Sequence, residues 1–249
     1  MTDTKKVYRY FLVHKPVGVI CSTIDPQPSN IIVKKDDPRC GERRHGKCRL
    51  TIYDIAQTNG FPTDIGLVGR LDMDTSGIML MTDDAILNSA IRTPVEENEK
   101  EKEEEEEEKT INLFKYKEYE MKLIGKRLLQ NIDVTSLERE LSSPFTFQRQ
   151  GRGYQTSPAN VRIERIWRDE QLSYGQPHLG WCISVRIKIR EGKHHQLRRM
   201  AKRSNLHVLS LHRSCIAHIL HSSSVPSGEC RWLSNDEINT LHAELVNKE

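Results

Sequence analysis

The sequence lacks the features of a membrane-embedded or exported protein. None of its apolar runs approaches the roughly 20 residues needed to cross a bilayer. The first six residues, Met1 to Lys6, carry an acid and contain no apolar segment of the kind that marks a secretory signal. We therefore expect an intracellular protein that is not bound to a membrane. The expected compartment is the cytoplasm or the nucleus, and an organelle is a further alternative.

Motifs for metals and nucleotide cofactors are also scarce. The six cysteines include no Cys-x-x-Cys pair, so a disulfide framework is not expected in a chain of 249 residues. Cys40, His45 and Cys48 could begin a zinc site, but no second pair with matching spacing completes it. Neither a Gly-rich phosphate loop nor a Gly-x-Gly-x-x-Gly motif occurs. We expect neither a metal nor a cofactor.

The charge is distributed unevenly along the chain. The whole sequence carries only +3, but residues 96–109 contain ten Glu and three Lys, a local charge of −7. The rest of the chain therefore carries +10, which suits a polyanionic partner such as RNA. The acidic segment, at about 95–110, is expected to be a disordered insertion.

Periodicity favours an α+β fold with a mixed, mainly antiparallel sheet and flanking helices. In Trp181–Ile189 every second residue is apolar and its neighbours are mostly polar, which is the period of a half-buried strand. Ser234 and Glu237 form a capping box at the start of a final helix. The residues between 23 and 49 are expected to form a long loop. The other elements expected are strands at 8–13, 77–82 and 119–123, a Pro/Gly turn and a second strand within 15–20, and helices at 83–92 and 196–203.

Three side chains are candidates for chemistry. Asp72 lies in a loop just before a buried strand, where active sites are often built, although a lone acid there is more often a cap or an ion-pair partner. Tyr119 lies on a half-buried strand, where a simple core aromatic is the alternative. Arg198 lies beside the apolar stripe of its helix, and a partly desolvated guanidinium favours a carboxylate partner over an ordinary surface position.

The sequence resembles the RsuA-type pseudouridine synthases along nearly its whole length. Gly69–Asp84 is similar to the family's signature segment, and Glu191–Met200 is similar to its third motif. His14 stands where the family carries Asn, and Ala85 stands where it usually carries Gly. Shorter similarities, in the same order as in the family, are His14–Val19, Lys117–Met121, Val208–Ile216 and Gly228–Leu233.

This resemblance implies a pseudouridine synthase fold and specific roles. Asp72 would be the nucleophile that attacks the target uridine nucleoside, so that the base detaches, rotates and rejoins through carbon. Tyr119 would stack on that base and assist proton removal, and Arg198 would pair with Asp72. Leu211 would form an apolar pocket wall, with plain core packing as the alternative. The substrate-binding surface would further include Arg70, Lys193, His195, Arg199, Lys202 and Arg203.

The expected organisation is one catalytic domain over residues 7–245, without a separate S4 RNA-binding domain. We expect a monomer that acts on RNA, most simply ribosomal RNA within a pre-ribosomal particle. Two alternatives stay open: a catalytically silent ribosome-assembly factor that binds RNA, and a synthase that acts on transfer or messenger RNA.

Overall fold

The computed structural model describes residues 7–23, 49–92, 116–125, 133–173 and 180–245. The acidic insertion, nearly all of the 23–49 loop and the Cys40–His45–Cys48 cluster lie outside these residues. Within the described ranges, no helix is both long enough and apolar enough to span a bilayer.

One mixed sheet runs through the described part of the chain, and only one of its strand pairs is parallel there. The strand order is β11-β1-β3-β9-β4-β8-β7, and every adjacent pair is antiparallel except β3 and β9. This confirms the α+β prediction. The strands are β1 (Tyr10–Lys15), β3 (Ser76–Thr82), β4 (Lys117–Gly125), β7 (Asn160–Arg168), β8 (Trp181–Ile189), β9 (Leu206–Ile216) and β11 (Cys230–Trp232), with short β2 (Gly66–Leu67) on β3 and β10 (Leu220–His221) on β9.

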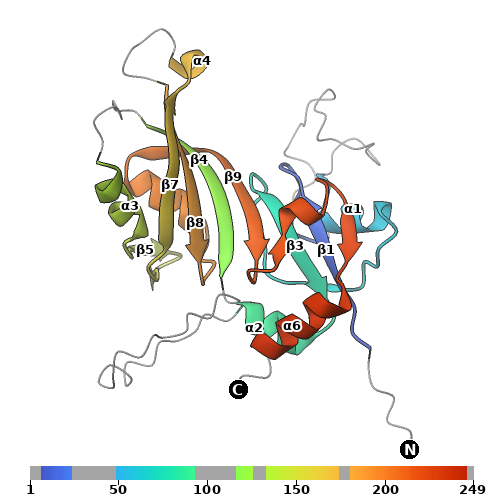
Figure 1. The fold of residues 1–249 in the computed structure, drawn as a ribbon. Helices are drawn as coiled ribbons and strands as arrows, with labels where there is room; N and C mark the ends of the chain where they lie inside the picture. The colour runs from blue at the N-terminus through green and yellow to red at the C-terminus, as the bar shows by residue number, and fades with distance from the viewer. Residues whose placement is uncertain (1–6, 24–48, 93–115, 126–132, 174–179, 246–249) are drawn as a thin grey trace, which may run out of the picture.

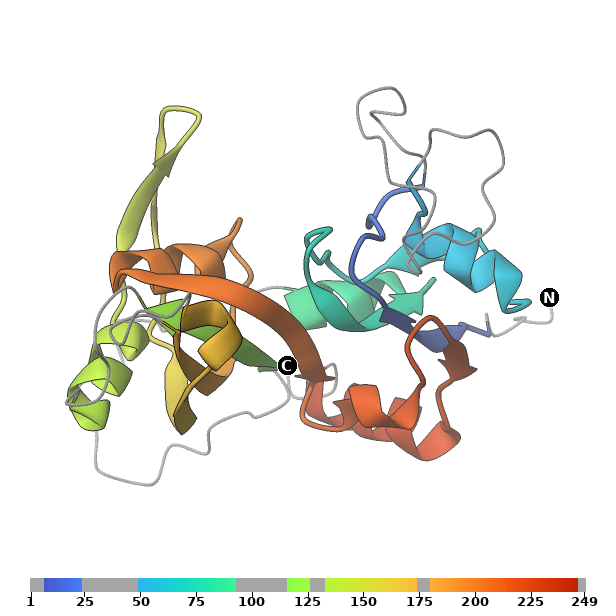
Figure 2. The ribbon, with the colours of Figure 1, turned by 90° about the horizontal axis from the view of Figure 1, so that it is seen from above.

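The parallel pair joins two halves of the sheet. It consists of two residue pairs, Ser76 with His212 and Gly77 with Arg213. Figure 1 shows β1 and β3 on one side of this junction and β4, β8 and β7 on the other. Viewed from above, the two halves lie side by side and meet at the end of β9 (Figure 2).

Helices cover the two faces of the sheet unequally. Helices α2 (Ala85–Arg92) and α6 (Asn235–Leu245) pack on one face of the β1–β3 half (Figure 1) and bury Leu12 and Leu80 there. The other face carries the larger core, to which α1 (Ile52–Thr58), α3 (Val134–Ser142) and α5 (Gln196–Arg203) contribute. The remaining elements are α4 (Glu170–Ser173), the 3-10 turn Ser222–Ser224, and a separate hairpin of β5 (Thr146–Arg149) and β6 (Arg152–Gln155).

Most of the elements expected from periodicity are confirmed. Strand 181–189 and helix 196–203 have the predicted bounds. The Ser234–Glu237 capping box forms in both directions, with Glu237 Oε2 accepting from the Ser234 N–H and Ser234 Oγ accepting from the Glu237 N–H. Helix α2 begins at Ala85, and Asp84 Oδ1 accepts two N–H groups of its first turn.

The Pro/Gly turn predicted within 15–20 is confirmed, but the strand predicted to follow it is wrong. Ile20 forms only an isolated bridge to Thr51, in the parallel sense. The chain turns at Val17 and Gly18, and Gly18 has a left-handed φ of 90°. The Gly18 N–H donates to the Met73 carbonyl at 2.9 Å, so this segment binds the loop before β3 and does not extend the sheet.

Candidate active site

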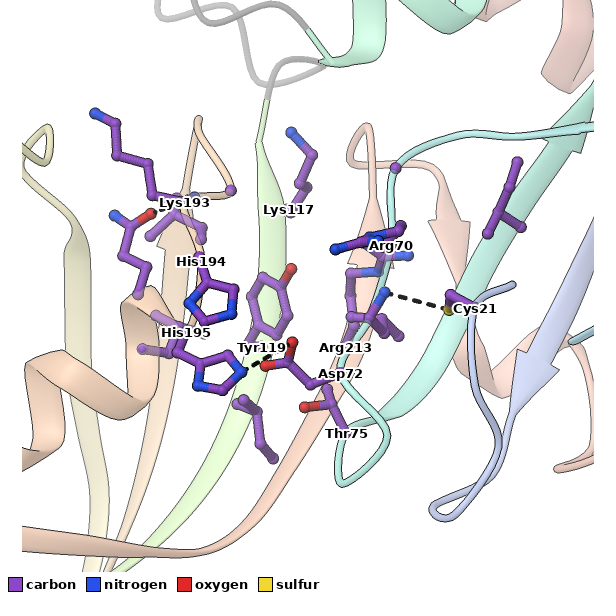
Figure 3. A pocket seen from close by; sticks show the side chains of 18 of the residues that line it. Cys21, Arg70, Asp72, Thr75, Lys117, Tyr119, Lys193, His194, His195 and Arg213 are labelled. Carbon is purple, nitrogen blue, oxygen red and sulfur yellow. Dashed lines mark hydrogen bonds and ion pairs between the residues drawn. The ribbon is translucent and has the colours of Figure 1, made fainter. Parts of the chain in front are cut away.

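A cavity of about 780 Å³ opens at the junction of the two half-sheets. The loop from Leu67 to Asp72, which leads from β2 towards β3, forms one wall. Tyr119 of β4 and Leu211 of β9 form part of its base, and the turn at 192–195 before α5 forms the opposite wall (Figure 3). Residues far apart in the sequence therefore meet where β9 pairs with β3.

The charges that line this cavity are almost all positive. Among the described lining residues, Asp72 is the only acid. Seven basic side chains surround it: Arg70, Arg92, Lys117, Arg149, Lys193, Arg198 and Arg213. Such a surface attracts phosphates and other anions. The cavity thus presents a single carboxylate inside a strongly cationic wall.

The loop that carries Asp72 is held by main-chain contacts. The Thr75 N–H donates to the Asp72 carbonyl at 3.0 Å, which closes a tight turn. Lys15 is fully buried, and its Nζ donates to the carbonyls of Val19 at 2.8 Å and Met73 at 3.3 Å. The Leu71 N–H donates to Cys21 Sγ at 3.4 Å (Figure 3). These contacts fix the backbone and leave the Asp72 side chain 39% exposed towards the cavity.

The partner of the Asp72 carboxylate differs from the predicted one. His195 Nε2 lies 3.6 Å from Asp72 Oδ1, and Figure 3 shows the imidazole and the carboxylate next to each other. Arg198 lines the same cavity, but its Nη2 donates to the Asp74 main-chain carbonyl at 3.0 Å. The predicted ion pair between Arg198 and Asp72 is therefore not formed in this structure. Arg198 contacts the loop that carries Asp72 and not the Asp72 carboxylate.

Tyr119 lies in the wall next to Asp72, as Figure 3 shows. It is 6% exposed, and its neighbours across the sheet are Ile187 of β8 and Arg213 of β9. Arg213 is also buried, and its Nε donates to the Ile78 carbonyl at 2.8 Å. An aromatic side chain is thus held rigidly beside the single carboxylate.

A buried carboxylate organises the opposite wall. Glu191 is 3% exposed, and its Oε1 accepts from the Ser157 N–H at 2.8 Å and from Gln196 Nε2 at 2.7 Å. Its Oε2 forms an ion pair with Lys193 Nζ at 2.5 Å. Gln196 Oε1 in turn accepts from the Lys193 N–H at 3.0 Å. These hydrogen bonds and the ion pair connect residues 191–196 to one another and to Ser157. They therefore hold the turn at 192–195 in one conformation.

Two histidines project from this turn. Their rings stack with centroids 3.9 Å apart and planes 10° apart. His195 has a left-handed φ of 53°, which turns the chain into α5. Burial, followed by the proximity of His195, lowers the pKa of His194.

The structure brings only some of the predicted substrate-binding residues together. Arg70, Lys193, His195 and Leu211 line the cavity, while Arg199, Lys202 and Arg203 do not. Arg199 lies over the ring of Phe147, 4.5 Å from its centroid. Arg203 donates to the carbonyls of Pro144 and Ser143 at 3.3 and 3.2 Å, beyond the C-terminal end of α3. The Arg203 guanidinium therefore has a structural partner in the described part of the chain.

Several residues in and around the cavity were not predicted from the sequence. Lys15 is the last residue of β1 and lies in the His14–Val19 segment that resembles the family, so the sequence carried a signal for it. Burial lowers the pKa of its ammonium group to about 8. Thr75 is 1% exposed, lines the cavity and has no hydrogen-bond partner for its buried hydroxyl among the described residues. Arg149 reaches the cavity from the β5–β6 hairpin, for which the sequence showed no pattern. Across the described ranges, no cluster of three or more His, Cys, Asp or Glu is placed to hold a metal ion.

Comparisons with known proteins give a consistent result. A family model described as RNA pseudouridylate synthase matches residues 9–203. The chain is 27% identical over 235 residues to ribosomal small subunit pseudouridine synthase A of Yersinia pestis, covering 94% of this chain and 73% of that protein. It is 25% identical over 233 residues to the protein of the same name from Escherichia coli K12, with 94% and 74% covered.

A crystal structure of a pseudouridylate synthase has the same fold. The sequence of that protein is 21% identical to this chain. The match covers 96% of this chain and 75% of the other, with a TM-score of 0.57. This likeness supports the fold described above.

Proposed function

The chain belongs to the RNA pseudouridylate synthase family, and on this premise we propose that it isomerises a specific uridine of ribosomal RNA, with Asp72 as the nucleophile. It is an RNA pseudouridine synthase and thus an isomerase. Ribosomal RNA is the proposed substrate because the relatives from Yersinia pestis and Escherichia coli are named for the small ribosomal subunit. We further infer that the described residues between 7 and 245 form one catalytic domain, since one sheet runs through both halves.

One observation carries the assignment of the site. Asp72 is the only acid among the described residues that line a basic cavity, and it lies beside the buried aromatic ring of Tyr119. A nucleophilic carboxylate, a stacking face and a phosphate-binding surface are the three parts that this reaction needs. All three meet at the junction of β3, β4 and β9.

The chemistry follows from these positions. The target uridine must leave the RNA stack to enter this cavity, and the Tyr119 ring replaces the stacking that the base loses. A carboxylate oxygen of Asp72 bonds to the sugar carbon that carries the base, and the bond from that carbon to the base nitrogen breaks. The freed base rotates. A base carbon then bonds to the same sugar carbon, and the bond to Asp72 breaks, which restores the free carboxylate. The proton on that base carbon leaves with help from Tyr119, and the freed nitrogen gains a proton. Atoms and electrons balance within the nucleoside, so the reaction requires no external oxidant or reductant.

The basic wall would bind the phosphates on both sides of the flipped nucleotide. Arg70 lies on the Asp72 side of the cavity and Lys193 on the side of the two histidines, as Figure 3 shows. Leu211 would contact the base as part of the apolar lining. Arg198, bonded to the Asp74 carbonyl, would keep the Asp72 loop against α5.

Chemical mapping of pseudouridine in cellular RNA tests this proposal. Cells that lack the gene are complemented with the wild type, with Asp72→Asn, or with Glu164→Gln, a control on the opposite face of the sheet that pairs with Arg186. We expect one ribosomal RNA site to depend on the wild type and the control, and to be absent with Asp72→Asn. If the site lost with Asp72→Asn lies in transfer or messenger RNA, that RNA and not ribosomal RNA is the substrate. Identical pseudouridine maps for all strains would contradict the proposed activity and favour the alternative that the protein binds RNA without modifying it.

A further inference from the structure

We propose that His195 is the positioning residue of the nucleophile: its imidazole holds the Asp72 carboxylate in the orientation for attack. This inference rests on the proposed function of Asp72. It assigns to the turn before α5 a role that was predicted for Arg198.

The contact itself is specific. Among the described residues, His195 is the only charged or titratable side chain that makes an ion-pair contact with Asp72, with 3.6 Å between Nε2 and Oδ1. An imidazole with its proton on Nε2 presents an N–H to that oxygen, and the doubly protonated ring does so as well. The distance exceeds that of a formed hydrogen bond. Catalytic hydrogen bonds are commonly longer before the substrate binds and tighten in the complex.

The surroundings of His195 restrict its ring to few positions. Its ring stacks on His194 at 3.9 Å, which fixes the plane of the imidazole. The Glu191–Lys193–Gln196 network described above holds the backbone on both sides of the two histidines. The left-handed φ of His195 directs its side chain away from the helix and towards the loop of Asp72. A non-glycine residue in this conformation costs free energy, which is consistent with a functional requirement.

Exposure indicates when this contact matters. The side chains of His195 and Asp72 are 46% and 39% exposed, so water screens their attraction before RNA binds. A nucleotide seated in the cavity excludes that water, and the same contact becomes stronger in the lower dielectric. We therefore expect His195 to act on the rate of the bound complex and to contribute little to RNA affinity.

The test separates rate from binding with three variants. His195→Gln keeps an N–H donor at nearly the reach of Nε2. His195→Asn tolerates the left-handed backbone but ends short of Asp72, and His195→Ala removes the donor. The single-turnover rate constant is measured at saturating RNA, and the RNA Kd is measured separately. His207→Ala, an exposed histidine on β9 away from the cavity, is the matched control.

We expect His195→Ala and His195→Asn to lower the rate constant by about 10- to 100-fold, the loss typical of a misplaced reacting group. Their Kd should stay near that of the wild type, and His195→Gln should recover most of the rate. A wild-type rate in His195→Ala would overturn the inference, as would a loss confined to Kd or an equal loss in all three variants. Asp72→Asn in the same assay tests the proposed function separately: if it is as active as the wild type, that function is wrong.

Discussion

Gly77 on β3 lies directly against the main chain of Arg213 on β9. A Cβ atom on Gly77 would stand 2.3 Å from the Arg213 carbonyl oxygen and 2.5 Å from its nitrogen. This close approach forms the parallel junction between the two half-sheets, which places the Asp72 loop against Tyr119. The geometry of the active site thus depends on a residue that carries no functional group.

We expect Gly77→Ala to lower the free energy of unfolding by about 2–4 kcal/mol, because the new methyl group meets backbone and φ is +123°. Urea unfolding measures this change. Gly153→Ala on β6 is the control, since a Cβ there meets nothing within 4 Å. Equal stabilities of the two variants would show that the junction accommodates a side chain.

The buried Lys15 should make stability depend on pH. Its pKa is about 8 in the folded chain against 10.5 for an ordinary lysine, so between these values the unfolded chain holds a proton that the folded chain has lost. Stability due to Lys15 therefore rises with pH across this window, by at most about 1.4 kcal/mol per pH unit. The measurement is the difference in unfolding free energy between the wild type and Lys15→Met.

The comparison with Lys15→Met is needed because other titratable groups make the free energy of unfolding fall as pH rises. Burial raises the pKa of the Cys215 and Cys230 thiols to about 12, which lowers stability as pH rises above 9. Both cysteines are present in the wild type and the variant, so their contributions cancel. A difference that stays flat from pH 8 to 10 would mean that the pKa of Lys15 is not depressed.

Thr75→Val separates stability from activity. The Thr75 hydroxyl is buried without a partner among the described residues, which costs about 1–3 kcal/mol, so a methyl group of the same shape should leave the protein as stable as the wild type or more so. If the hydroxyl bonds the bound nucleotide, the rate should fall although the melting temperature does not. A variant that is less stable than the wild type would show that the hydroxyl has a partner in the folded chain.

Charges in the cavity wall should appear in the salt dependence of RNA binding. Arg70→Ala and Lys193→Ala should each reduce the slope of log K against log salt by about 0.7–1 if each side chain contacts one phosphate. Arg186→Ala is the control, because Arg186 pairs with Glu164 on the face of the sheet away from the cavity. Equal slopes for the three variants would place the RNA elsewhere on the surface.

Periodicity predicted the elements whose burial is one-sided. Strand β8 alternates cleanly, and α5 shows an apolar stripe, so both were found with their bounds. The β5–β6 hairpin was not found, because Thr146–Gln155 is largely exposed and has no buried face to impose a period. Arg149 on that hairpin was missed for the same reason.

The sequence predicted several residues that line the cavity, but it did not predict the contacts between them. Asp72, Tyr119 and Arg198 do line one cavity. The contact of His195 with the Asp72 carboxylate depends on the left-handed turn at His195 and on the hydrogen-bond network around Glu191. Neither feature appears in local sequence patterns. Arg203 was predicted to bind the substrate, yet the end of α3 supplies partners for its guanidinium through tertiary packing.

The rate of pseudouridine formation by purified Asp72→Asn is the most direct test of the proposed mechanism. Single-turnover assays on the RNA identified by mapping should show a loss of at least about a thousand-fold against the wild type, the scale expected when a nucleophile is removed. RNA affinity and the unfolding transition should stay unchanged, because the Asp72 side chain is partly exposed and the main chain holds its loop. An Asp72→Asn enzyme that binds the RNA and retains a rate within about ten-fold of the wild type would contradict the assignment of Asp72 as the nucleophile.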